Sequence, residues 1–314
     1  MSKKEYLNRL EAALATLSYE ERQAALRYYE EYLWDAGEEN EAAAIAELGS
    51  PEALAAKILC ESRTTAAQST KAEPQQGANA DHLLPFSSIN LNLTNADVTL
   101  YMGTAYAITL DFPDNYPSPD VEVRDNTLYV KEKRFSQSFF GIRWFGYMKK
   151  AAVTITLPDV QYNRFAFNMV NGALKVPAFR VRELKAESVN GGINVSGVKG
   201  ELIHLSSVNG GLGASDVSTT QECKCDTVNG GIDISGTLRG KVIASAVNGG
   251  IHVSIPLSGK DYNLNVSTIS GSVRVNGQKM SKSFHLQNGA PNSIKADTVN
   301  GGIRVELESG TIVL

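Results

Sequence analysis

The chain of 314 residues lacks any apolar run long enough to cross a membrane as a helix, which takes about 18 consecutive apolar residues. Its start, Met1-Ser2-Lys3-Lys4-Glu5, carries lysines but no apolar stretch behind them, so no secretory signal is expected. Three cysteines are too few for a disulfide framework in a chain of this length. These absences predict a cytoplasmic protein. The alternative is exposure at the cell surface by a non-classical route.

The chain also lacks an excess of basic charge and the motifs of known catalytic sites. Its formal net charge at pH 7 is −4, which gives no general attraction for nucleic acid, so no direct nucleic-acid binding is expected. It contains no phosphate-binding loop, no G-x-S-x-G sequence and no Cys-His pair in a supporting context. We therefore predict that the protein is not an enzyme and has no catalytic residues, cofactor site or metal site. The four histidines are scattered along the chain: His82, His204, His252 and His285.

Residues 1–62 predict a small bundle of four helices, because they are rich in Ala, Leu and Glu and have almost no β-branched residues. The sequence Gly49-Ser50-Pro51 combines a helix-ending glycine, an N-cap serine and a proline suited to a first helical turn. Residues 1–60 hold 6 Lys or Arg against 12 Asp or Glu, so this helical module is acidic.

The second of these helices, about 19–36, carries more aromatic surface than one helix face can bury. Two interpretations remain open. The rings form the core and rim of the bundle, or they form a docking surface, since exposed aromatic side chains favour protein interfaces. The candidate partner-binding residues are Tyr28, Tyr29, Tyr32 and Trp34.

Three stretches of the module resemble the bacterial HAAS signalling domain family: Leu7 to Leu14, Tyr28-Tyr29-Glu30-Glu31-Tyr32 and Glu47-Leu48-Gly49-Ser50-Pro51-Glu52. The resemblance covers nearly all of residues 1–62. It implies a cytoplasmic helical module with a regulatory role, often found alongside PadR-type transcription regulators. Members commonly continue into a transmembrane segment, a feature that is not expected here.

Residues 63–83 are polar, small and short of large apolar side chains, which predicts a flexible linker. From residue 84 the hydrophobic pattern changes to alternation, as in Ile89, Leu91 and Leu93. Residues 84–169 are therefore predicted to form a less regular β region in front of the repeats described below.

Residues 135–150 combine six aromatic residues with Arg143, Lys149 and Lys150. We favour the interpretation that this stretch covers an open end of the β domain, where unpaired strand edges need protection. The alternatives are docking to a membrane surface or to a protein.

The most informative feature is a repeat of Val-Asn-Gly-Gly followed by Ile or Leu. Successive copies, including degenerate ones at residues 170 and 269, begin 19, 19, 20, 19, 22 and 30 residues apart. Apolar residues occupy fixed columns on both sides of each copy. Each repeat therefore predicts two short strands that pair with their counterparts one coil away, in a parallel β-solenoid whose repeats cover residues 170–314.

The asparagine of the repeat is interpreted as structural. Like residues stack in a solenoid, so the asparagines are predicted to form a side-chain amide ladder at the corner between the two strands. Asn and Gly also tolerate the left-handed backbone that such a corner can require. The predicted ladder residues are Asn171, Asn190, Asn209, Asn229, Asn248 and Asn300.

Other residues of the repeats also have structural interpretations. Cys223 and Cys225 occupy inward columns and are predicted to be buried free thiols, rather than a disulfide or a metal site. His204 and His252 fall in outward columns and are expected to be solvated. Residues 276–292 lengthen the last step and predict an inserted loop, whose role the sequence does not indicate.

The repeats resemble a second family, the putative-adhesin β-solenoid domain of many bacteria, over roughly residues 84–314. The resemblance implies a right-handed parallel β-helix or β-roll, here with coils of about 19 residues. Together with the N-terminal helical bundle, this predicts a mainly β protein. Some members of that family are parts of cell-envelope stress proteins.

These features predict a non-enzymatic regulatory or scaffold protein. The acidic helical module would bind a protein partner, such as a PadR-type regulator or an envelope-stress component. The solenoid would give a binding surface or form a homo-oligomer through its ends. One alternative is an adhesin-like cell-envelope protein. The other is a carbohydrate-acting β-helix enzyme, which would require a cleft of stacked carboxylates with Lys or Arg.

Overall fold

A computed structural model describes residues 3–17, 22–23, 25–26, 29–30, 33, 41–56, 58–59, 83–113, 118–132 and 151–308 of the chain. The chain divides into two compact units. The helical unit contains the described residues up to 59, and the β unit contains those from 83 onward. Apart from Leu83, the predicted linker lies outside the described residues, so its flexibility stays a prediction.

In the helical unit, α1 covers Lys3–Ala13 and α3 covers Glu41–Leu48, and residues 51–56 are also helical. Gly49 ends α3 with a φ of 78°, a left-handed conformation that glycine adopts without strain. The Ser50 hydroxyl accepts a hydrogen bond at 3.1 Å from the amide three residues further on, and so caps the next helix as the sequence predicts.

A small apolar core holds the helical unit together. It takes side chains from every described part of the unit: Tyr6, Leu10, Leu14, Ala25, Tyr29, Leu33, Ala44, Ile45, Leu54, Ala55 and Ile58. Within the described residues, no helix is long and apolar enough to cross a membrane.

The described part of the β unit is a sheet system of 20 strands. In chain order they are β1 (Ser88–Gly103), β2 (Ala107–Asp111), β3 (Asp120–Arg124), β4 (Thr127–Lys131), β5 (Ala151–Pro158), β6 (Gln161–Asn171), β7 (Leu174–Val176), β8 (Arg180–Asn190), β9 (Ile193–Ser196) and β10 (Lys199–Ser207). They continue with β11 (Leu212–Asn229), β12 (Ile232–Leu238), β13 (Lys241–Asn248), β14 (Ile251–Ser258), β15 (Tyr262–Ser270), β16 (Val273–Val275), β17 (Gln278–Met280), β18 (Ser283–Leu286), β19 (Asn292–Asn300) and β20 (Ile303–Glu308).

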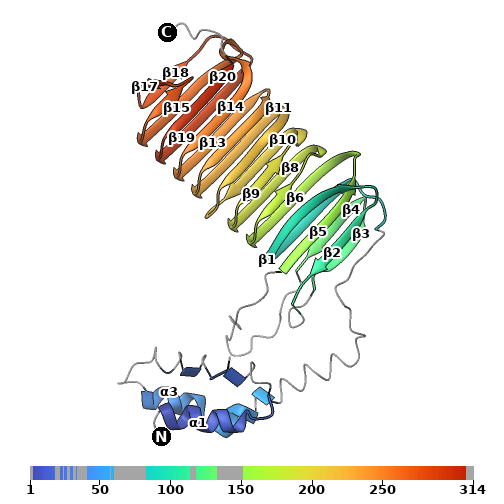
Figure 1. The fold of residues 1–314 in the computed structure, drawn as a ribbon, viewed down its shortest axis with the longest axis vertical. Coiled ribbons are helices and arrows are strands. Elements are labelled where there is room, and N and C mark those ends of the chain that lie inside the picture. The colour runs from blue at the N-terminus through green and yellow to red at the C-terminus, as the bar shows by residue number, and fades with distance from the viewer. Residues whose placement is uncertain are drawn as a thin grey trace. The chain divides into compact units, whose positions relative to one another are not determined.

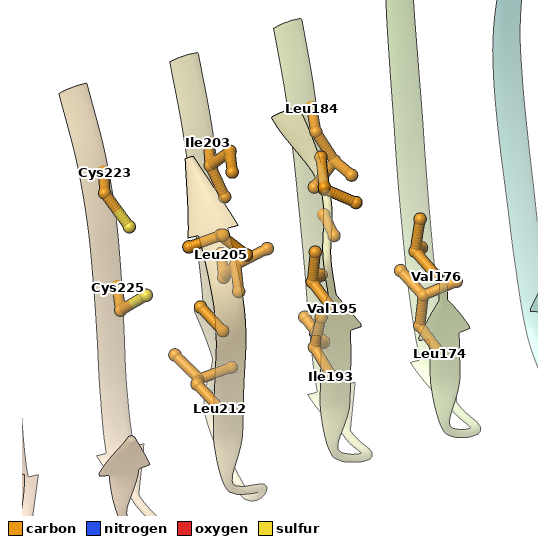
Figure 2. Packing of buried hydrophobic residues seen from close by; sticks show 14 of the residues in the cluster. Leu174, Val176, Leu184, Ile193, Val195, Ile203, Leu205, Leu212, Cys223 and Cys225 are labelled. Atoms are coloured by element: carbon orange, nitrogen blue, oxygen red, sulfur yellow. The ribbon is translucent and has the colours of Figure 1, made fainter. Parts of the chain in front are cut away.

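Alternating apolar residues produce these strands, and stacking buries them. In β5, every second side chain from Ala151 to Leu157 is buried. Figure 2 shows how like positions of neighbouring coils lie over one another; Leu184, Ile203 and Cys223 form one such column. Each buried Ile, Leu or Val contributes on the order of 1.5–3 kcal/mol before conformational entropy is subtracted.

The Asn-Gly sequences of the repeats do not form hairpins, whereas Asn276-Gly277, outside the repeats, joins the antiparallel strands β16 and β17. β6 pairs in parallel with β8, with Phe165 opposite Leu184 and Asn171 opposite Asn190, and β8 pairs in the same way with β10. Each Val-Asn-Gly-Gly turn leads the chain into a second parallel stack, in which β7, β9 and the first part of β11 pair. The fold is mainly β, with a large solenoid-like stack of parallel strands, as the sequence predicts.

At the C-terminal end, the coils do not stack in the order of the sequence (Figure 1). β19 lies between β13 and β15, and β20 lies between β14 and β16. The repeat that begins at Val299 is therefore the second coil from this end, and the repeat that begins at Ile269 is the last. The loop predicted over residues 276–292 instead contains β17 and β18, which pair antiparallel with β16 and β15.

The N-terminal end of the β unit has the same arrangement. β1 pairs in parallel with β6 and β7 on one side and with β4 and β5 on the other, so the first strand is again in the second coil from the end. β2 and β3 pair antiparallel with β5 and β4. β1 thus belongs to the regular stack, although the sequence predicts a less regular region there.

Short antiparallel strands stand at both described ends of the stack, namely β2 and β3 at one end and β17 and β18 at the other. Such strands limit pairing with another chain, which a long open edge would invite. Residues 135–150 lie outside the described residues, so their role as an end cover or a docking stretch stays a prediction.

Candidate functional site

The turns of the repeat bring the predicted asparagines together on the surface of the β unit. From Asn190 onward, each side-chain amide donates to the side-chain oxygen of the asparagine in the preceding coil, at 2.8–2.9 Å. The row begins one coil earlier than predicted, since Asn171 donates to Asn95 at 2.6 Å. It follows the coils in space, because Asn300 donates directly to Asn248. The full ladder is Asn95, Asn171, Asn190, Asn209, Asn229, Asn248 and Asn300.

The first glycine of each repeat is required by close packing. A Cβ atom at Gly230 would overlap the carbonyl oxygen of Gly210 in the preceding coil, and the first glycines of the other repeats have the same environment. None of these glycines and none of the ladder asparagines has a positive φ. The left-handed backbone that Asn and Gly would tolerate is therefore not used at this corner. Glycine is needed because the backbones of adjacent coils meet at this turn.

A buried column of hydroxyl groups, which is not among the features predicted from the sequence, lies directly before the first residue of several repeats. Ser207 Oγ donates to the carbonyl oxygen of Gly191 at 3.0 Å, and Thr227 Oγ1 donates to that of Gly210 at 3.1 Å. Two further hydroxyls donate in the same way at 2.9 Å, those of Thr268 and Thr298. These groups satisfy the same carbonyl oxygens that exclude a side chain at the first glycine. The signal is a recurrence of Ser or Thr at one aligned position.

The second glycine of each repeat, unlike the first, has room for a side chain. A Cβ atom at Gly231 would lie 3.6 Å from the nearest neighbouring atom, the carbonyl oxygen of Gly250, which is ordinary contact distance. Ala173 and Ser272 occupy this position in the two degenerate repeats. An open groove of about 810 Å³ follows the column, and its lining includes Gly211, Gly231, Gly250, Ser272 and Gly302.

Charged side chains line the same groove. Asp233, His252, Arg304 and Arg274 follow one another on adjacent parallel strands. His252 Nδ1 lies 3.2 Å from Asp233 Oδ2, and its Nε2 lies 3.5 Å from Glu306 Oε2. His252 thus lies between two carboxylates, and its side chain is 33% exposed, so the ring expected to be solvated is partly so. Arg304 Nε lies 3.9 Å from Glu306 Oε1.

The remaining candidate residues of the solenoid do not form a reactive site. Cys223 and Cys225 are buried and free, as predicted. A hydrogen bond with Cys223 and burial raise the pKa of the Cys225 thiol, which keeps it protonated and unreactive. His204 faces outward, with its Nε2 at 2.7 Å from Glu222 Oε1. Where the chain is described, no group of three or more His, Cys, Asp or Glu residues could hold a metal ion.

In the helical unit, the structure places one of the four candidate partner-binding residues. Tyr29 is 3% exposed and belongs to the core, so its ring is not available for docking. The other three lie outside the described residues: Tyr28, Tyr32 and Trp34. A groove of about 560 Å³ does lie on this unit, lined by Leu7, Leu26 and several charged residues, namely Lys3, Lys4, Glu11 and Glu30.

Two family models match the chain. The model described as Toastrack DUF4097 matches residues 86–248, which is about half of the chain, and the HAAS model matches residues 5–57. No curated protein matches the chain significantly.

Two solved structures are similar to the chain at low sequence identity. One is a "putative cell adhesion protein" from Clostridium sporogenes, with 13% identity and a TM-score of 0.36 over 74% of this chain and 100% of that chain. The other is a "putative adhesin" from Bacteroides fragilis, with 14% identity and a TM-score of 0.39 over 74% of this chain and 95% of that chain. Similarity of this degree says nothing about what the present chain binds.

Proposed function

The chain belongs to the Toastrack DUF4097 family, and on this premise we propose that it is a non-enzymatic scaffold protein whose helical module binds a protein partner. The observation that carries the proposal is the continuous stack of coils, joined by the asparagine ladder from Asn95 to Asn300. Such a stack offers a rigid surface that repeats at the strand spacing of about 4.8 Å. We take the coil to be right-handed with about 19 residues per turn. Asn171 lies opposite Asn190 in the neighbouring coil, 19 residues further along the chain, which supports this length.

We propose no catalytic activity for the β unit, because the residues that line its groove do not suit a carbohydrate-cleaving enzyme. A carbohydrate-cleaving β-helix would need acidic side chains stacked across neighbouring coils. The groove of this β unit instead places a single lining carboxylate, that of Asp233, in a column with His252, Arg304 and Arg274.

The helical module is proposed to be the partner-binding element. It matches the HAAS family over residues 5–57, and residues 1–60 hold 12 acidic side chains against 6 basic ones. The groove at Leu7 and Leu26 combines apolar surface with a charged rim, which suits an amphipathic helix of a partner. We propose a regulatory protein as this partner, with a PadR-type regulator as the first candidate and an envelope-stress component as the second.

Capture experiments with the full chain test partner binding. Asn8 is an exposed residue of the helical groove, so Asn8→Arg fills the groove and leaves the core intact. Gln278→Arg adds the same side chain at an exposed position of β17, in the other unit. We expect the wild type and Gln278→Arg to capture the same regulator, and Asn8→Arg to capture at least about tenfold less. Equal capture by all three proteins contradicts the assignment of the groove.

The cytoplasm is proposed as the location. Protease treatment of intact cells, followed by detection of this protein with an antibody, tests the proposal. Protection of the protein until the cells are lysed supports a cytoplasmic regulator. Cleavage on intact cells supports the adhesin-like alternative, in which the solenoid is the binding element outside the cell.

A further inference from the structure

The groove of the β unit contains a row of backbone amides that have no hydrogen-bond partner among the described residues. The carbonyl oxygen of each second glycine accepts a hydrogen bond from a neighbouring coil, as that of Gly250 does from the Ile232 amide at 2.9 Å. The N–H groups of these glycines, in contrast, donate to no residue in the described part of the chain. They repeat once per coil, at about 4.8 Å. The glycines concerned are Gly211, Gly231, Gly250 and Gly302.

The coil of β1 shows which kind of group such an amide binds. Asp97 holds the place of the second glycine in that coil, since the next residue, Val98, pairs with Leu174. The carboxylate of Asp97 accepts a hydrogen bond at 2.6 Å from the amide of Ala173, one coil further on. A carboxylate therefore occupies, in the first coils, the position that remains open along the groove.

Packing does not explain why glycine recurs at this second position. A Cβ atom at Gly211, Gly231, Gly250 or Gly302 would come no closer than 3.4 Å to any neighbouring atom. Ala173 and Ser272 show that a side chain is accommodated there. Glycine at this position keeps the groove open, whereas the first glycine allows the coils to approach.

Two arginines give one end of the groove a preference for anions. Arg274 and Arg304 lie directly opposite each other on adjacent strands, where like charges repel unless an anion lies beside them. Glu306 approaches Arg304 at 3.9 Å, and Asp233 is engaged by His252 at 3.2 Å. Arg274 forms an ion pair with none of the described acidic residues, so a bound carboxylate would compensate its charge.

We propose that this groove binds a linear polyuronate, whose carboxylates accept hydrogen bonds from the glycine amides and pair with Arg274 and Arg304. In an extended, 1,4-linked polyuronate successive rings turn to opposite sides, so the carboxylates on one side recur at about twice the coil spacing and the polymer stays in register with every second amide along the groove. An extended acidic peptide does not, because the side chains on one of its faces recur at about 6.6 Å. The proposal extends the scaffold role and is independent of the helical module, so its failure leaves partner binding untouched.

Calorimetric titration of the full chain with purified oligogalacturonate tests the proposal. Gly250→Asp copies the Asp97 arrangement, because the new carboxylate would accept the Gly302 amide and fill the groove. Ala173→Asp makes the same change in the same column but outside the groove lining. We expect the wild type and Ala173→Asp to bind, and Gly250→Asp to bind about 10- to 100-fold more weakly.

A second variant, Arg274→Gln/Arg304→Gln, removes the cations without adding a side chain to the turn. This variant is expected to weaken binding of oligogalacturonate to a similar degree. If Gly250→Asp does not fold, the arginine variant alone tests the proposal. Unchanged binding by the arginine variant overturns the proposal. Poly-L-glutamate and neutral dextran are the comparison ligands. If the protein binds polyglutamate but not oligogalacturonate, the ligand is an acidic peptide and the polyuronate proposal is overturned. If it binds neither polymer, water alone satisfies the amides and the proposal is also overturned.

Discussion

Single residues in each turn of the repeat have four distinct physical roles. In most repeats the residue before the valine supplies a buried hydroxyl; the asparagine donates a hydrogen bond to the preceding coil, the first glycine allows a close backbone approach, and the second glycine leaves an open place. The sequence predicts the asparagine column, because identical residues recur at a constant interval. It does not predict why glycine is needed, because that depends on the distance between coils, which no single coil reveals.

The hydroxyl column can be tested by one substitution at two equivalent positions. Ser207→Ala removes a donor to the Gly191 carbonyl and should lower the free energy of unfolding by about 1 kcal/mol. Ser188 is also buried, but its hydroxyl has no partner in the described part of the chain, so Ser188→Ala should be neutral or slightly stabilising. Chemical denaturation measures both, and equal losses would refute the distinction.

The two glycines of one turn should respond in opposite ways to alanine. Gly230→Ala forces a Cβ atom onto the carbonyl oxygen of Gly210 and should lower the free energy of unfolding by at least about 3 kcal/mol. Gly231→Ala has 3.6 Å of clearance and should change it by less than about 1 kcal/mol, in either direction. Thermal melting followed by circular dichroism compares the two variants. Similar melting temperatures would mean that the coils can separate at this turn.

At the scale of strands, the pattern of columns is sufficient to predict the parallel stack. Asn-Gly between apolar segments favours a hairpin when it is read alone. Here the stacking of like residues overrides that preference, since Asn171 pairs with Asn190 in the neighbouring coil. β17 and β18 are not predicted, because they are short, lie outside the repeat and pair antiparallel at the end of the stack.

The ladder itself is tested in the middle of the stack. Asn229→Ala removes two side-chain hydrogen bonds, one to Asn209 and one from Asn248. We expect a loss of about 1–2 kcal/mol in the free energy of unfolding, and therefore a lower melting temperature. The control is Asn194→Ala, at an exposed strand position outside the ladder, which should melt like the wild type. An unchanged melting temperature for Asn229→Ala would show that the ladder adds nothing to stability.

At the scale of the whole β unit, the order of the coils could not be predicted from the repeat. The degenerate copy at Ile269 precedes the complete copy at Val299 in the sequence but lies beyond it in space. Ser270 stands opposite Asn300, where the ladder ends. At this end the terminal coil carries the copy without an asparagine, whereas the degenerate copy at residue 170 lies inside the stack and keeps Asn171 in the ladder. The 30-residue step is the largest irregularity of this kind in the repeat, and a longer step predicts an insertion rather than a change in the order of coils.

Truncation tests this order of coils. Removing residues 291–314 deletes β19 and β20, to which β13, β14, β15 and β16 are bonded. We expect amide hydrogen exchange in these four strands to accelerate at least about tenfold, with β6, β8 and β10 unchanged, because each repeat depends on its direct neighbours. Removal of residues 309–314 alone is the control. If the amides of β15 stay protected from exchange after the larger deletion, β15 does not depend on β19 and the order of coils is contradicted.

The position of β1 and β20 inside the stack has a mechanical consequence. Each is the first or last described strand of the β unit along the chain, yet each is bonded along both of its edges. Tension transmitted through the segment before β1 would have to shear two rows of hydrogen bonds at once, where a strand on an open edge could be peeled off one bond at a time. The β unit is thus anchored at the two places where the rest of the chain can pull on it.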